Sequence, residues 1–315
     1  MKFSIGIPAY KTVFFKECID SVLNQEYTDF ELIIVDDNSP NDIRSIVNLY
    51  DSDKIQYIRN EKNFGALHVV DNWNKCLSLA KGEFFILLGD DDRMRPNYLS
   101  EFANLIEKYP ACGVYHCRSV IIDENSEPIT LTEPRPEFES VYDAILQRIM
   151  GKRHFFISDY VYRTSTLKSN GGFYKLPLAW ASDDISSYIG SMQNGIAHTN
   201  EPVFEYRLNT HSISSNGSLN NKLAAIKGEE DWLTNFLQKD PHHPVDAILK
   251  ENIQSEVKKF IQKKKIRTIC DSNGNNPLSL VKWRLQDTGK NLSLQEFIYA
   301  LILSYKERRK YRYAS

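Results

Sequence analysis

The sequence has few residues of the kinds that build disulfide scaffolds or zinc sites. Its five cysteines include no Cys-x-x-Cys pair, and neither they nor the seven histidines show the spacing of metal ligands. An odd number of cysteines without a disulfide-like framework is typical of proteins from a reducing compartment. The pattern therefore excludes cysteine-rich secreted folds and structural zinc modules.

Long apolar runs are absent as well. No segment approaches the roughly 18 consecutive apolar residues of a membrane span, and the apolar run 297–303 is far too short. The first apolar run is interrupted at Pro8, so the amino terminus lacks the pattern of a secretory signal. We therefore expect a cytoplasmic protein.

Three common motifs of nucleotide-binding proteins and hydrolases are missing. There is no G-x-G-x-x-G after the first predicted strand, no G-x-x-x-x-G-K-[ST], and no G-x-S-x-G. These absences exclude the usual dinucleotide-binding proteins, the P-loop NTPases and the hydrolases with a nucleophile elbow.

Charge is distributed unevenly along the chain. The net charge is −2, but residues 251–315 contain 14 Lys and Arg against 6 Asp and Glu, a balance of +8 that leaves −10 for residues 1–250. The acidic main part argues against nucleic-acid binding. The basic tail predicts either an anionic partner surface or a solvated helical face.

Strand-like and helical segments alternate along the first two-thirds of the 315 residues, which are enough for one large domain and an appendage. This alternation predicts a mainly parallel sheet flanked by helices, with ligands bound beyond the carboxyl ends of its strands. From about residue 217 onward, only amphipathic helices are predicted. The predicted strands are 3–7, 30–35, 55–58, 84–88, 112–122, 156–162 and 202–207; the predicted helices are 14–25, 41–50, 66–80, 98–108, 140–150 and 184–194, with a loop over 123–139.

The most informative segment is the apolar run 84–88, which is followed by Gly89 and by the aspartates Asp90, Asp91 and Asp92. Adjacent carboxylates at a buried strand end repel one another, so a positive partner is expected. Mg²⁺ and Mn²⁺ suit such oxygen ligands and bind substrate phosphates as well. A solvated acidic turn is the alternative, and the position directly after a buried strand favours the cation.

Two further acidic pairs have both structural and functional interpretations. Asp36 and Asp37 follow the strand 30–35, where they would either cap a helix or accept hydrogen bonds from a nucleobase or a ribose. Asp183 and Asp184 open a helix, whose dipole stabilises them, and a carboxylate there is also suited to act as a general base.

Several polar or flexible residues flank the second pair. Gly171 and Gly172 allow the backbone to approach a ligand closely, and Trp180 precedes the acidic pair. Arg207, after the last predicted strand, is placed to meet a phosphate or one of the acidic clusters. In the same loop, His211 is more readily explained as a structural histidine than as a ligand.

Taken in order, these segments resemble the family 2 glycosyltransferases, which have the GT-A fold. Each motif alone is weak, but the ordered set is highly specific and extends to about residue 214. It consists of 4–10 (Ser-Ile-Gly-Ile-Pro-Ala-Tyr), 21–25, 31–39, 63–65, 80–83, 90–92, Pro96, 171–173, 183–184 and 206–207.

The resemblance implies a Rossmann-like, mainly parallel sheet flanked by helices, with a C-terminal helical extension. Residues 1–216 would form the GT-A domain, with a nucleotide-sugar half (1–97) and an acceptor half (98–216), and residues 217–315 would form the helical region. It also implies that Asp184 is the catalytic base, preceded by the acidic Asp183. Asp91 would be the metal-binding carboxylate of the DxD motif, with Asp92 as a second contributor. Nucleotide binding is assigned to Pro8, Ala9, Tyr10, Asp36, Asp37 (base) and Asp90 (ribose), and an acceptor or phosphate loop to Gly172, Trp180, Arg207 and His211.

The chain departs from the family pattern in two places. Gly89 stands where many relatives carry the first Asp of the DxD motif, so metal binding would depend on residues 90–92. The segment 71–74 reads Asp-Asn-Trp-Asn instead of the usual Ala-Arg-Asn, so a familiar cationic contact to the diphosphate is missing.

The implied activity is an inverting, metal-dependent glycosyl transfer of the hexosyltransferase type, with Mn²⁺ or Mg²⁺ as cofactor. The donor would be a nucleoside-diphosphate sugar, with a UDP-sugar favoured, and the acceptor a hydroxyl of a glycan or lipid-linked glycan in bacterial surface polysaccharide assembly. One alternative is a non-catalytic nucleotide-sugar-binding module of the same fold, which would not hydrolyse donor sugars. The other is a metal-dependent nucleotidyltransferase, which would release pyrophosphate.

The tail gives a separate prediction. Residues 292–315 join an apolar helical segment to a basic end. Such a segment suits the anionic inner face of a membrane, where a lipid-linked acceptor would lie. A helix packed on the main domain or on a second subunit is the alternative. The basic residues are Lys306, Arg308, Arg309, Lys310 and Arg312.

Overall fold

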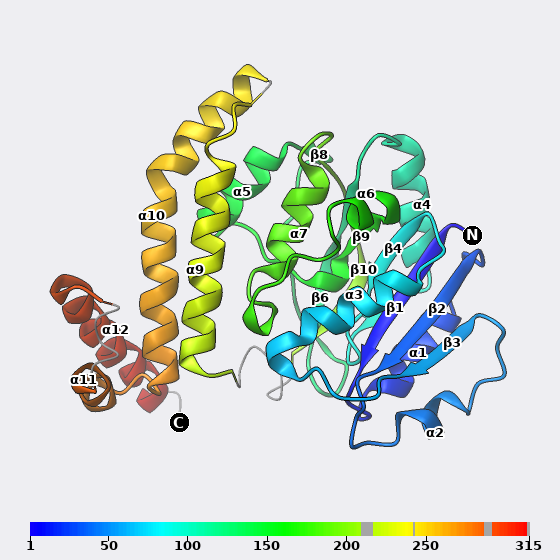
Figure 1. Ribbon diagram of the computed structural model, residues 1–315, viewed down its shortest axis with the longest axis horizontal. Coiled ribbons are helices and arrows are strands. Elements are labelled where there is room, and N and C mark those ends of the chain that lie inside the picture. Colours follow the sequence, from blue (N-terminus) through cyan, green and yellow to red (C-terminus); the bar gives the residue numbers. More distant parts are fainter. Residues whose placement is uncertain (209–216, 242, 287–291, 314–315) are drawn as a thin grey trace.

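The computed structural model describes residues 1–208, 217–241, 243–286 and 292–313 (Figure 1). Its centre is a ten-stranded sheet in the order β3-β2-β1-β4-β9-β6-β10-β5, with β7 paired to β6 and β8 to β10. The strands are β1 (Phe3–Ala9), β2 (Phe30–Asp36), β3 (Ile55–Arg59), β4 (Phe84–Leu87), β5 (Arg93–Met94), β6 (Val114–Ile122), β7 (Pro128–Leu131), β8 (Phe138–Glu139), β9 (Tyr160–Arg163) and β10 (Ile196–Arg207).

Most of the long strands run in one direction. β1 pairs in parallel with β2 and β4, β2 with β3, and β6 with β10. β9 lies antiparallel between β4 and β6, so these two strands also share a direction. The predicted α/β class with a mainly parallel sheet is confirmed, and the carboxyl ends of β1, β2, β4, β6 and β10 lie along one edge.

Helices cover both faces of the sheet, because its central strands are apolar on both sides. One core holds the side chains of α1, α2 and α4 against the sheet, and the other holds those of α3, α5, α6 and α7. The helices are α1 (Phe15–Leu23), α2 (Ile43–Val47), α3 (Val69–Leu79), α4 (Tyr98–Lys108), α5 (Val141–Ile149), α6 (Thr164–Ser169) and α7 (Ser182–Ser191), with 3₁₀ turns η1 (Ala66–His68), η2 (Ile157–Asp159) and η3 (Pro177–Ala179).

The C-terminal part consists of α9 (Leu219–Phe236), α10 (Pro244–Ser272), α11 (Pro277–Leu285) and α12 (Leu294–Tyr313). α9 and α10 lie side by side and pack on α5 and the turn η3, and α11 and α12 follow at the lower end of α10 (Figure 1). Ile226 and Ile253, from α9 and α10, belong to the same apolar core as α3 and α5, whereas α11 and α12 form a small core with the end of α10. The predicted boundary near residue 216 therefore marks a change of element type rather than a change of core.

Three predictions of local structure were wrong. β1 continues through Pro8 to Ala9. The pairing of β1 with β4 ends at Gly6, so at Pro8 the strand pairs only with β2, and a proline, which has no backbone N–H, is tolerated there. The predicted loop 123–139 contains the short antiparallel strands β7 and β8. The segment 156–162 begins with the turn η2, and only its second half belongs to β9.

All five cysteines are buried free thiols. Within the described ranges, no helix is both long and apolar enough to cross a bilayer.

Candidate active site

The carboxyl ends of β1, β2 and β4 meet, and hydrogen bonds join the loops that follow them. Asp90 Oδ2 accepts hydrogen bonds from the backbone N–H groups of Tyr10 (2.8 Å) and Lys11 (2.7 Å). The carbonyl of Tyr10 accepts a hydrogen bond from Ser39 Oγ, at 2.5 Å. Predicted nucleotide-binding residues from three separate strands therefore lie together, with Ala9 buried and the Tyr10 side chain exposed.

Asp36 is fully buried and holds the turn after β2. Its Oδ2 accepts hydrogen bonds from Tyr57 Oη (2.7 Å) and Arg59 Nη1 (2.8 Å), and its Oδ1 accepts one from the backbone N–H of Ser39 (2.8 Å). This arrangement gives Asp36 a supporting position beneath the nucleotide loop.

Asp37 faces the segment that follows β3. Its Oδ1 accepts hydrogen bonds from Asn60 Nδ2 (2.9 Å) and from the backbone N–H of Phe64 (3.0 Å). Asn60 also donates to Asn72 Oδ1 at 3.0 Å, which connects Asp37 to α3. The carboxylate is therefore fixed at the end of β2, with the 63–65 segment of the predicted motif beside it.

The three aspartates after β4 have different surroundings. Asp91 Oδ2 lies 2.9 Å from Lys11 Nζ, and the Asp91 side chain is 18% exposed. Asp92 is buried, and its carboxylate accepts hydrogen bonds from the backbone N–H of Arg207 (3.0 Å) and from Ser158 Oγ (3.3 Å). Asp91 is thus the member of the cluster placed to meet a ligand, and Asp92 fixes the turn.

Electrostatics at this turn favour a further positive group. Burial and the neighbouring charge of Asp91 raise the pKa of the Asp90 carboxyl to about 6, and the same two causes raise the pKa of Asp92. Burial lowers the pKa of the Lys11 amine, but the charges of Asp91 and Asp90 outweigh it and the pKa is raised. Lys11 and the Arg207 guanidinium bring two positive charges to the three aspartates, and a further cation would offset the repulsion that remains between the carboxylates.

Gly89 is explained by the position of the carboxylates. A Cβ atom built on Gly89 would lie 2.7 Å from Asp92 Oδ2 and 3.3 Å from Asp91 Oδ1. The carboxylates fold back over this residue, so a larger side chain there would displace Asp92 from its hydrogen bonds.

Arg207 is fully enclosed at the end of β10 and supports the aspartate turn. Its Nε donates to the carbonyl of Asp91 (2.9 Å), and its Nη2 lies 3.0 Å from Glu17 Oε2. Nη1 donates to the carbonyl of Asp123 and to Ser126 Oγ, and the guanidinium lies over the Phe14 ring. Of the two roles predicted for Arg207, this geometry favours contact with the acidic cluster over contact with a phosphate.

The residues present fit a divalent cation held at Asp91. Among the described residues, no group of three or more His, Cys, Asp or Glu side chains is arranged to hold a metal alone. Mg²⁺ is commonly held by one or two carboxylates together with substrate phosphates and water, so one accessible carboxylate suffices. Asp91 offers the hard oxygen ligand, and the Asp90–Asp92 cluster supplies the negative field.

The segment 171–173 is fixed to α3. Asn74 Oδ1 accepts a hydrogen bond from the backbone N–H of Phe173 (2.8 Å), and Asn74 Nδ2 donates to the carbonyl of the same residue (3.2 Å). Trp73 packs edge-on against the Phe173 ring, and Asp71 pairs with Lys175 at 2.6 Å. The unusual 71–74 segment therefore joins α3 to the segment 171–175.

Replacing Gly172 by Ala is expected to lower the free energy of unfolding by about 3 kcal/mol or more. Gly172 has φ +87°, and an added Cβ would lie 2.2 Å from Asn74 Oδ1, so both hydrogen bonds to Phe173 would be disturbed. The matched control is Gly171→Ala. Gly171 has φ +86° with nothing within 4 Å of the added Cβ, so only the backbone cost of about 1 kcal/mol should appear. Urea unfolding measures both; equal losses would contradict the assigned contact.

A strained segment precedes the second acidic pair. Leu178, Ala179 and Ala181 have φ values of 61°, 57° and 65°, which non-glycine residues rarely adopt. Trp180 stands between them, and Lys222 Nζ of α9 lies 5.1 Å from the centre of its ring. The backbone thereby turns sharply just before Asp183 and Asp184 enter the first turn of α7.

Asp184 is buried, and its two carboxylate oxygens are in different environments. Oδ2 lies 3.1 Å from Arg148 Nε and Nη2, on α5. Oδ1 is buried and has no hydrogen-bond partner among the described residues. A buried, unpaired carboxylate oxygen is costly, which favours a ligand hydroxyl as its partner.

Asp183 is the less buried member of the pair. Its Oδ1 accepts a hydrogen bond from the backbone N–H of Asp184, at 2.9 Å. Burial and the charge of Asp184 raise the pKa of Asp183 to about 7, so the pair holds two negative charges only above that range.

The C-terminal helices add a second buried ion pair next to these aspartates. Glu229 of α9 is buried, and its Oε2 lies 2.6 Å from Lys264 Nζ of α10. Burial and the charge of Asp184 raise the pKa of Glu229, although Lys264 opposes them. Arg148, Glu229 and Lys264 were not found from the sequence, because they lie in no motif and far from the acidic pair along the chain.

Tyr206 connects the two acidic groups. Its ring stacks on Phe156 with a centroid distance of 3.8 Å. Burial and the charges of Asp92, Asp91 and Asp183 raise the pKa of Tyr206 to about 12. Because the charges of the β4 turn and of Asp183 both act on this phenol, the two acidic groups lie on either side of Tyr206 or close to it. His211, which the sequence placed in the same loop, lies outside the described residues.

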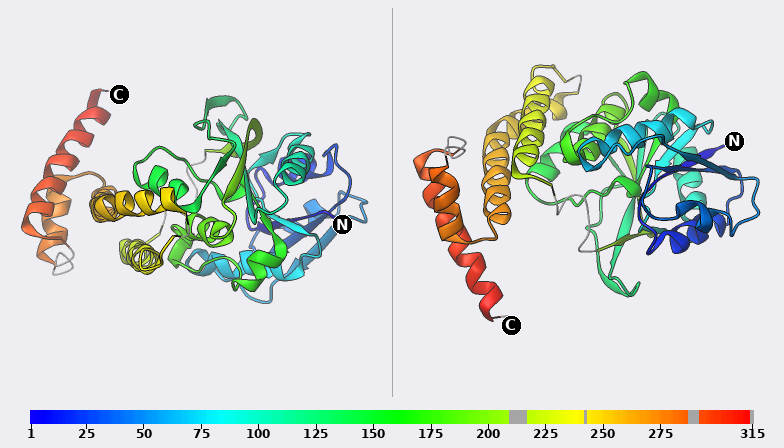
Figure 2. Two further views of the ribbon diagram at one scale, coloured as in Figure 1. Left: turned by 90° about the horizontal axis from the view of Figure 1, so that it is seen from above. Right: turned by 60° about the horizontal axis from the view of Figure 1, so that its bottom comes forward.

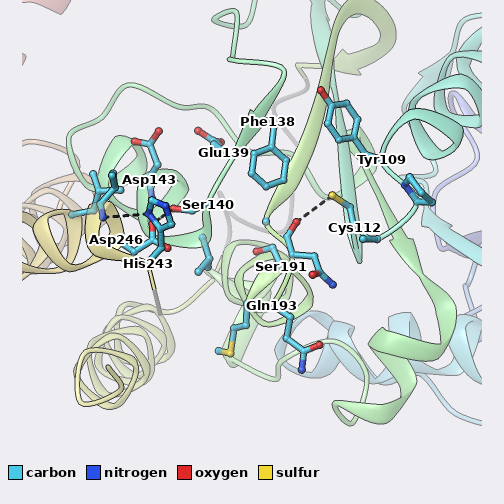
Figure 3. Close-up of a pocket in the computed structure, with 18 of the residues that line it drawn as sticks. Tyr109, Cys112, Phe138, Glu139, Ser140, Asp143, Ser191, Gln193, His243 and Asp246 are labelled. Atoms are coloured by element: carbon cyan, nitrogen blue, oxygen red, sulfur yellow. Dashed lines mark hydrogen bonds between the residues drawn. The ribbon is translucent and has the colours of Figure 1, made fainter. Parts of the chain in front are cut away.

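A cavity of about 760 Å³ lies at the opposite, amino-terminal edge of β6 and β10 (Figure 3). Phe138 and Tyr109 stack at its wall, and Cys112 Sγ donates to the carbonyl of Asn194. His243 and Asp246 of α10 close the other side. It contains none of the predicted site residues.

Comparison with known proteins agrees with this arrangement. Residues 4–164 match the model of Glycosyl transferase family 2. The chain is 25% identical over 218 residues to TuaG of Bacillus subtilis, whose name proposes a role in teichuronic acid biosynthesis; the match covers 68% of this chain and 81% of TuaG.

Two solved structures have a similar fold. Residues 1–349 of TarS from Staphylococcus aureus, in complex with UDP-GlcNAc, superpose with a TM-score of 0.66 at 17% identity, covering 98% of this chain and 92% of that one. The mannosyltransferase PcManGT of Pyrobaculum calidifontis, with GDP-Man and Mn²⁺, gives a TM-score of 0.54 at 14% identity over 97% and 86% of the two chains. This chain belongs to glycosyl transferase family 2, and its fold is GT-A.

Proposed function

We propose that this protein transfers a sugar from a nucleoside-diphosphate sugar to a hydroxyl group of a glycan acceptor, with inversion at the anomeric carbon. One arrangement supports the proposal: the aspartates after β4, with Lys11 beside Asp91, and Asp183 of α7 all lie close enough to the phenol of Tyr206 to raise its pKa. The division into a nucleotide-sugar half (1–97), an acceptor half (98–216) and a helical region (217–315) belongs to the same proposal.

The donor nucleotide would lie across the ends of β1, β2 and β4. Asp37 would accept a hydrogen bond from the base, Asp90 would contact the ribose, and residues 8–10 would line the pocket. UDP is the first nucleotide to examine, because TarS, which has a similar fold, was solved with UDP-GlcNAc.

Lys11 would contact the diphosphate and supply the cationic group that segment 71–74 lacks. The amine already lies beside Asp91, and a lysine acts as a strong point charge toward phosphate. A divalent cation such as Mn²⁺ or Mg²⁺, held by Asp91, would polarise the phosphate oxygens and stabilise the leaving diphosphate. PcManGT, whose fold is similar, was solved with Mn²⁺.

Asp184 would act as the base. Its unpaired Oδ1 would accept the proton of the acceptor hydroxyl, while Arg148 holds Oδ2 and fixes the carboxylate. The acceptor oxygen would attack the anomeric carbon from the face opposite to the diphosphate. The carbon–oxygen bond to the phosphate would break, and the nucleoside diphosphate would leave with the bonding electrons.

The biological setting is proposed from the relatives. TuaG is named for teichuronic acid biosynthesis, which supports a role in bacterial surface polysaccharide assembly with a glycan or lipid-linked glycan as acceptor. An intracellular donor pool would place the reaction in the cytoplasm.

Calorimetric titration with UDP, GDP, dTDP and CDP, each with and without Mn²⁺, tests the donor site. We expect one nucleotide, UDP first, to bind with Mn²⁺-dependent affinity, and its sugar conjugates to release that nucleoside diphosphate slowly without acceptor. Binding without any release would favour a non-catalytic binding module. Release of pyrophosphate instead would identify a nucleotidyltransferase.

A further inference from the structure

The outer surfaces of α11 and α12 carry large apolar side chains. On α12, Leu294, Ile298 and Ile302 follow one another at helical spacing and are 70%, 50% and 48% exposed. On α11, Leu278 and Leu285 are 71% and 79% exposed. The opposite sides of both helices are already packed in their small core with α10, so this outer face does not contribute to that core. We refer to these five residues as the apolar face.

The same helices are strongly basic. The sequences of α11 and α12 contain seven Lys and Arg (282, 284, 306, 308, 309, 310 and 312) and two Glu (296 and 307), a balance of +5. Lys282 and Lys306 are exposed. Exposed apolar side chains on helices with a basic sequence are typical of segments that bind the surface of an anionic membrane.

The two helices lie at the end of the molecule that holds the candidate site. β1 and β2 run toward the bottom of Figure 1, where α11 and α12 also lie, so these helices and the carboxyl ends of the strands are at the same end of the molecule. Figure 2 shows α11 and α12 at the far side of the molecule from the amino-terminal strands, with no element outside them.

We propose that the apolar face of α11 and α12 binds the surface of a membrane rich in anionic lipids. The apolar side chains would enter the boundary between headgroups and acyl chains, and the basic side chains would meet the lipid phosphates. A second copy of the chain is a poorer occupant, because a two-fold interface would bring two surfaces with a balance of +5 together. This inference does not depend on the proposed transfer reaction.

Vesicle flotation of the full-length protein tests the proposal. The probes are phosphatidylcholine vesicles with and without phosphatidylglycerol. The face variant carries Leu285→Ser, Ile298→Ser and Ile302→Ser. The control variant carries Leu49→Ser, Ile129→Ser and Leu131→Ser, whose parent residues are 67%, 55% and 46% exposed but lie on other elements.

We expect the wild type and the control variant to float with vesicles that contain phosphatidylglycerol, and to bind them less at high salt. Their affinity for these vesicles should be about tenfold higher than that of the face variant. Circular dichroism of each variant verifies its fold. Equal flotation of the face variant, or no flotation of the wild type with anionic vesicles, would overturn the proposal. Self-association in sedimentation velocity that the face variant loses, without vesicle binding, would instead identify a second copy as the partner.

Discussion

Asp184→Asn is expected to lower kcat by about 10²–10⁴-fold while leaving nucleotide affinity unchanged. The substitution preserves the size of the side chain, but an amide cannot take the proton of the acceptor hydroxyl. Asp184 Oδ1 is buried and has no hydrogen-bond partner among the residues that the structure describes, whereas Arg148 fixes the other carboxylate oxygen, Oδ2. Initial rates with saturating donor, and calorimetry with the nucleotide, measure the two quantities separately.

Asp183→Asn is the matched comparison, and its pH profile separates the roles of the two neighbours. Burial and the Asp184 charge raise the pKa of Asp183 to about 7, so the two carboxylates repel each other and become fully ionised only above that pH. Below about pH 7 the Asp183 carboxyl holds a proton, whereas an asparagine is neutral at every pH. The wild-type rate should therefore change near pH 7 as Asp183 gains its charge, and Asp183→Asn should lack that change while keeping most of the rate. If Asp183→Asn is inactive while Asp184→Asn retains its rate, the base is Asp183.

Much of the site was predictable because strand ends are local features of the sequence. The apolar runs before Asp36 and before Gly89 are long enough to identify buried strands, and parallel strands place their carboxyl ends along one edge. The acidic residues 36–37 and 90–92 were therefore expected at one edge of the sheet, and Asp90 Oδ2 accepts the N–H of Tyr10 just after the neighbouring β1. The family resemblance then added roles that spacing alone left open.

Contacts between distant segments were not predictable. Lys11 directly follows the Tyr10 of the predicted motif, but nothing in the sequence indicates that its amine reaches Asp91 across two strands. Arg148 lies on a helix 36 residues before Asp184 and would have been assigned to an exposed helical face. Short antiparallel strands such as β7, with four exposed residues, lack the apolar pattern that identifies a strand.

The C-terminal helices contain one feature that was predictable from the sequence and one that was not. The sequence predicted an apolar segment with a basic end in residues 292–315, and α12 has that character. The contribution of Leu278 and Leu285 was not recognised, because α11 shows too little periodicity on its own. Only the folded structure shows that these two side chains stay exposed while Leu280 of the same helix packs in the core with α10 and α12.

Substitutions of Asp91 and Lys11 should have different effects on the Mn²⁺ dependence of UDP binding, although the two side chains are paired. Asp91→Asn is expected to abolish the Mn²⁺-dependent part of UDP affinity and to lower kcat/KM on the order of 10³-fold, since a metal ion supplies several kcal/mol of stabilisation to a developing phosphate charge. Lys11→Gln should weaken UDP binding in EDTA about tenfold or more, which is the value of a charge-assisted hydrogen bond. It should leave the gain on adding Mn²⁺ intact, because the metal ligand remains.

The control for the pair is Lys16→Gln, which removes an exposed lysine that lies 2.7 Å from Asp20 on α1. This surface pair is expected to contribute little, so UDP affinity should not change. If Asp91→Asn still shows the full increase of UDP affinity on adding Mn²⁺, the cation is held by the substrate phosphates alone and Asp91 is not its ligand. If Lys11→Gln instead increased affinity for Mn²⁺ and UDP together, the lysine would be a competitor for the metal position. Lys11 Nζ donates a hydrogen bond to Asp91 Oδ2 in this structure. Weaker UDP binding by Lys11→Gln would show that the lysine contacts the diphosphate, whereas tighter binding of Mn²⁺ and UDP would show that it competes with the cation for Asp91.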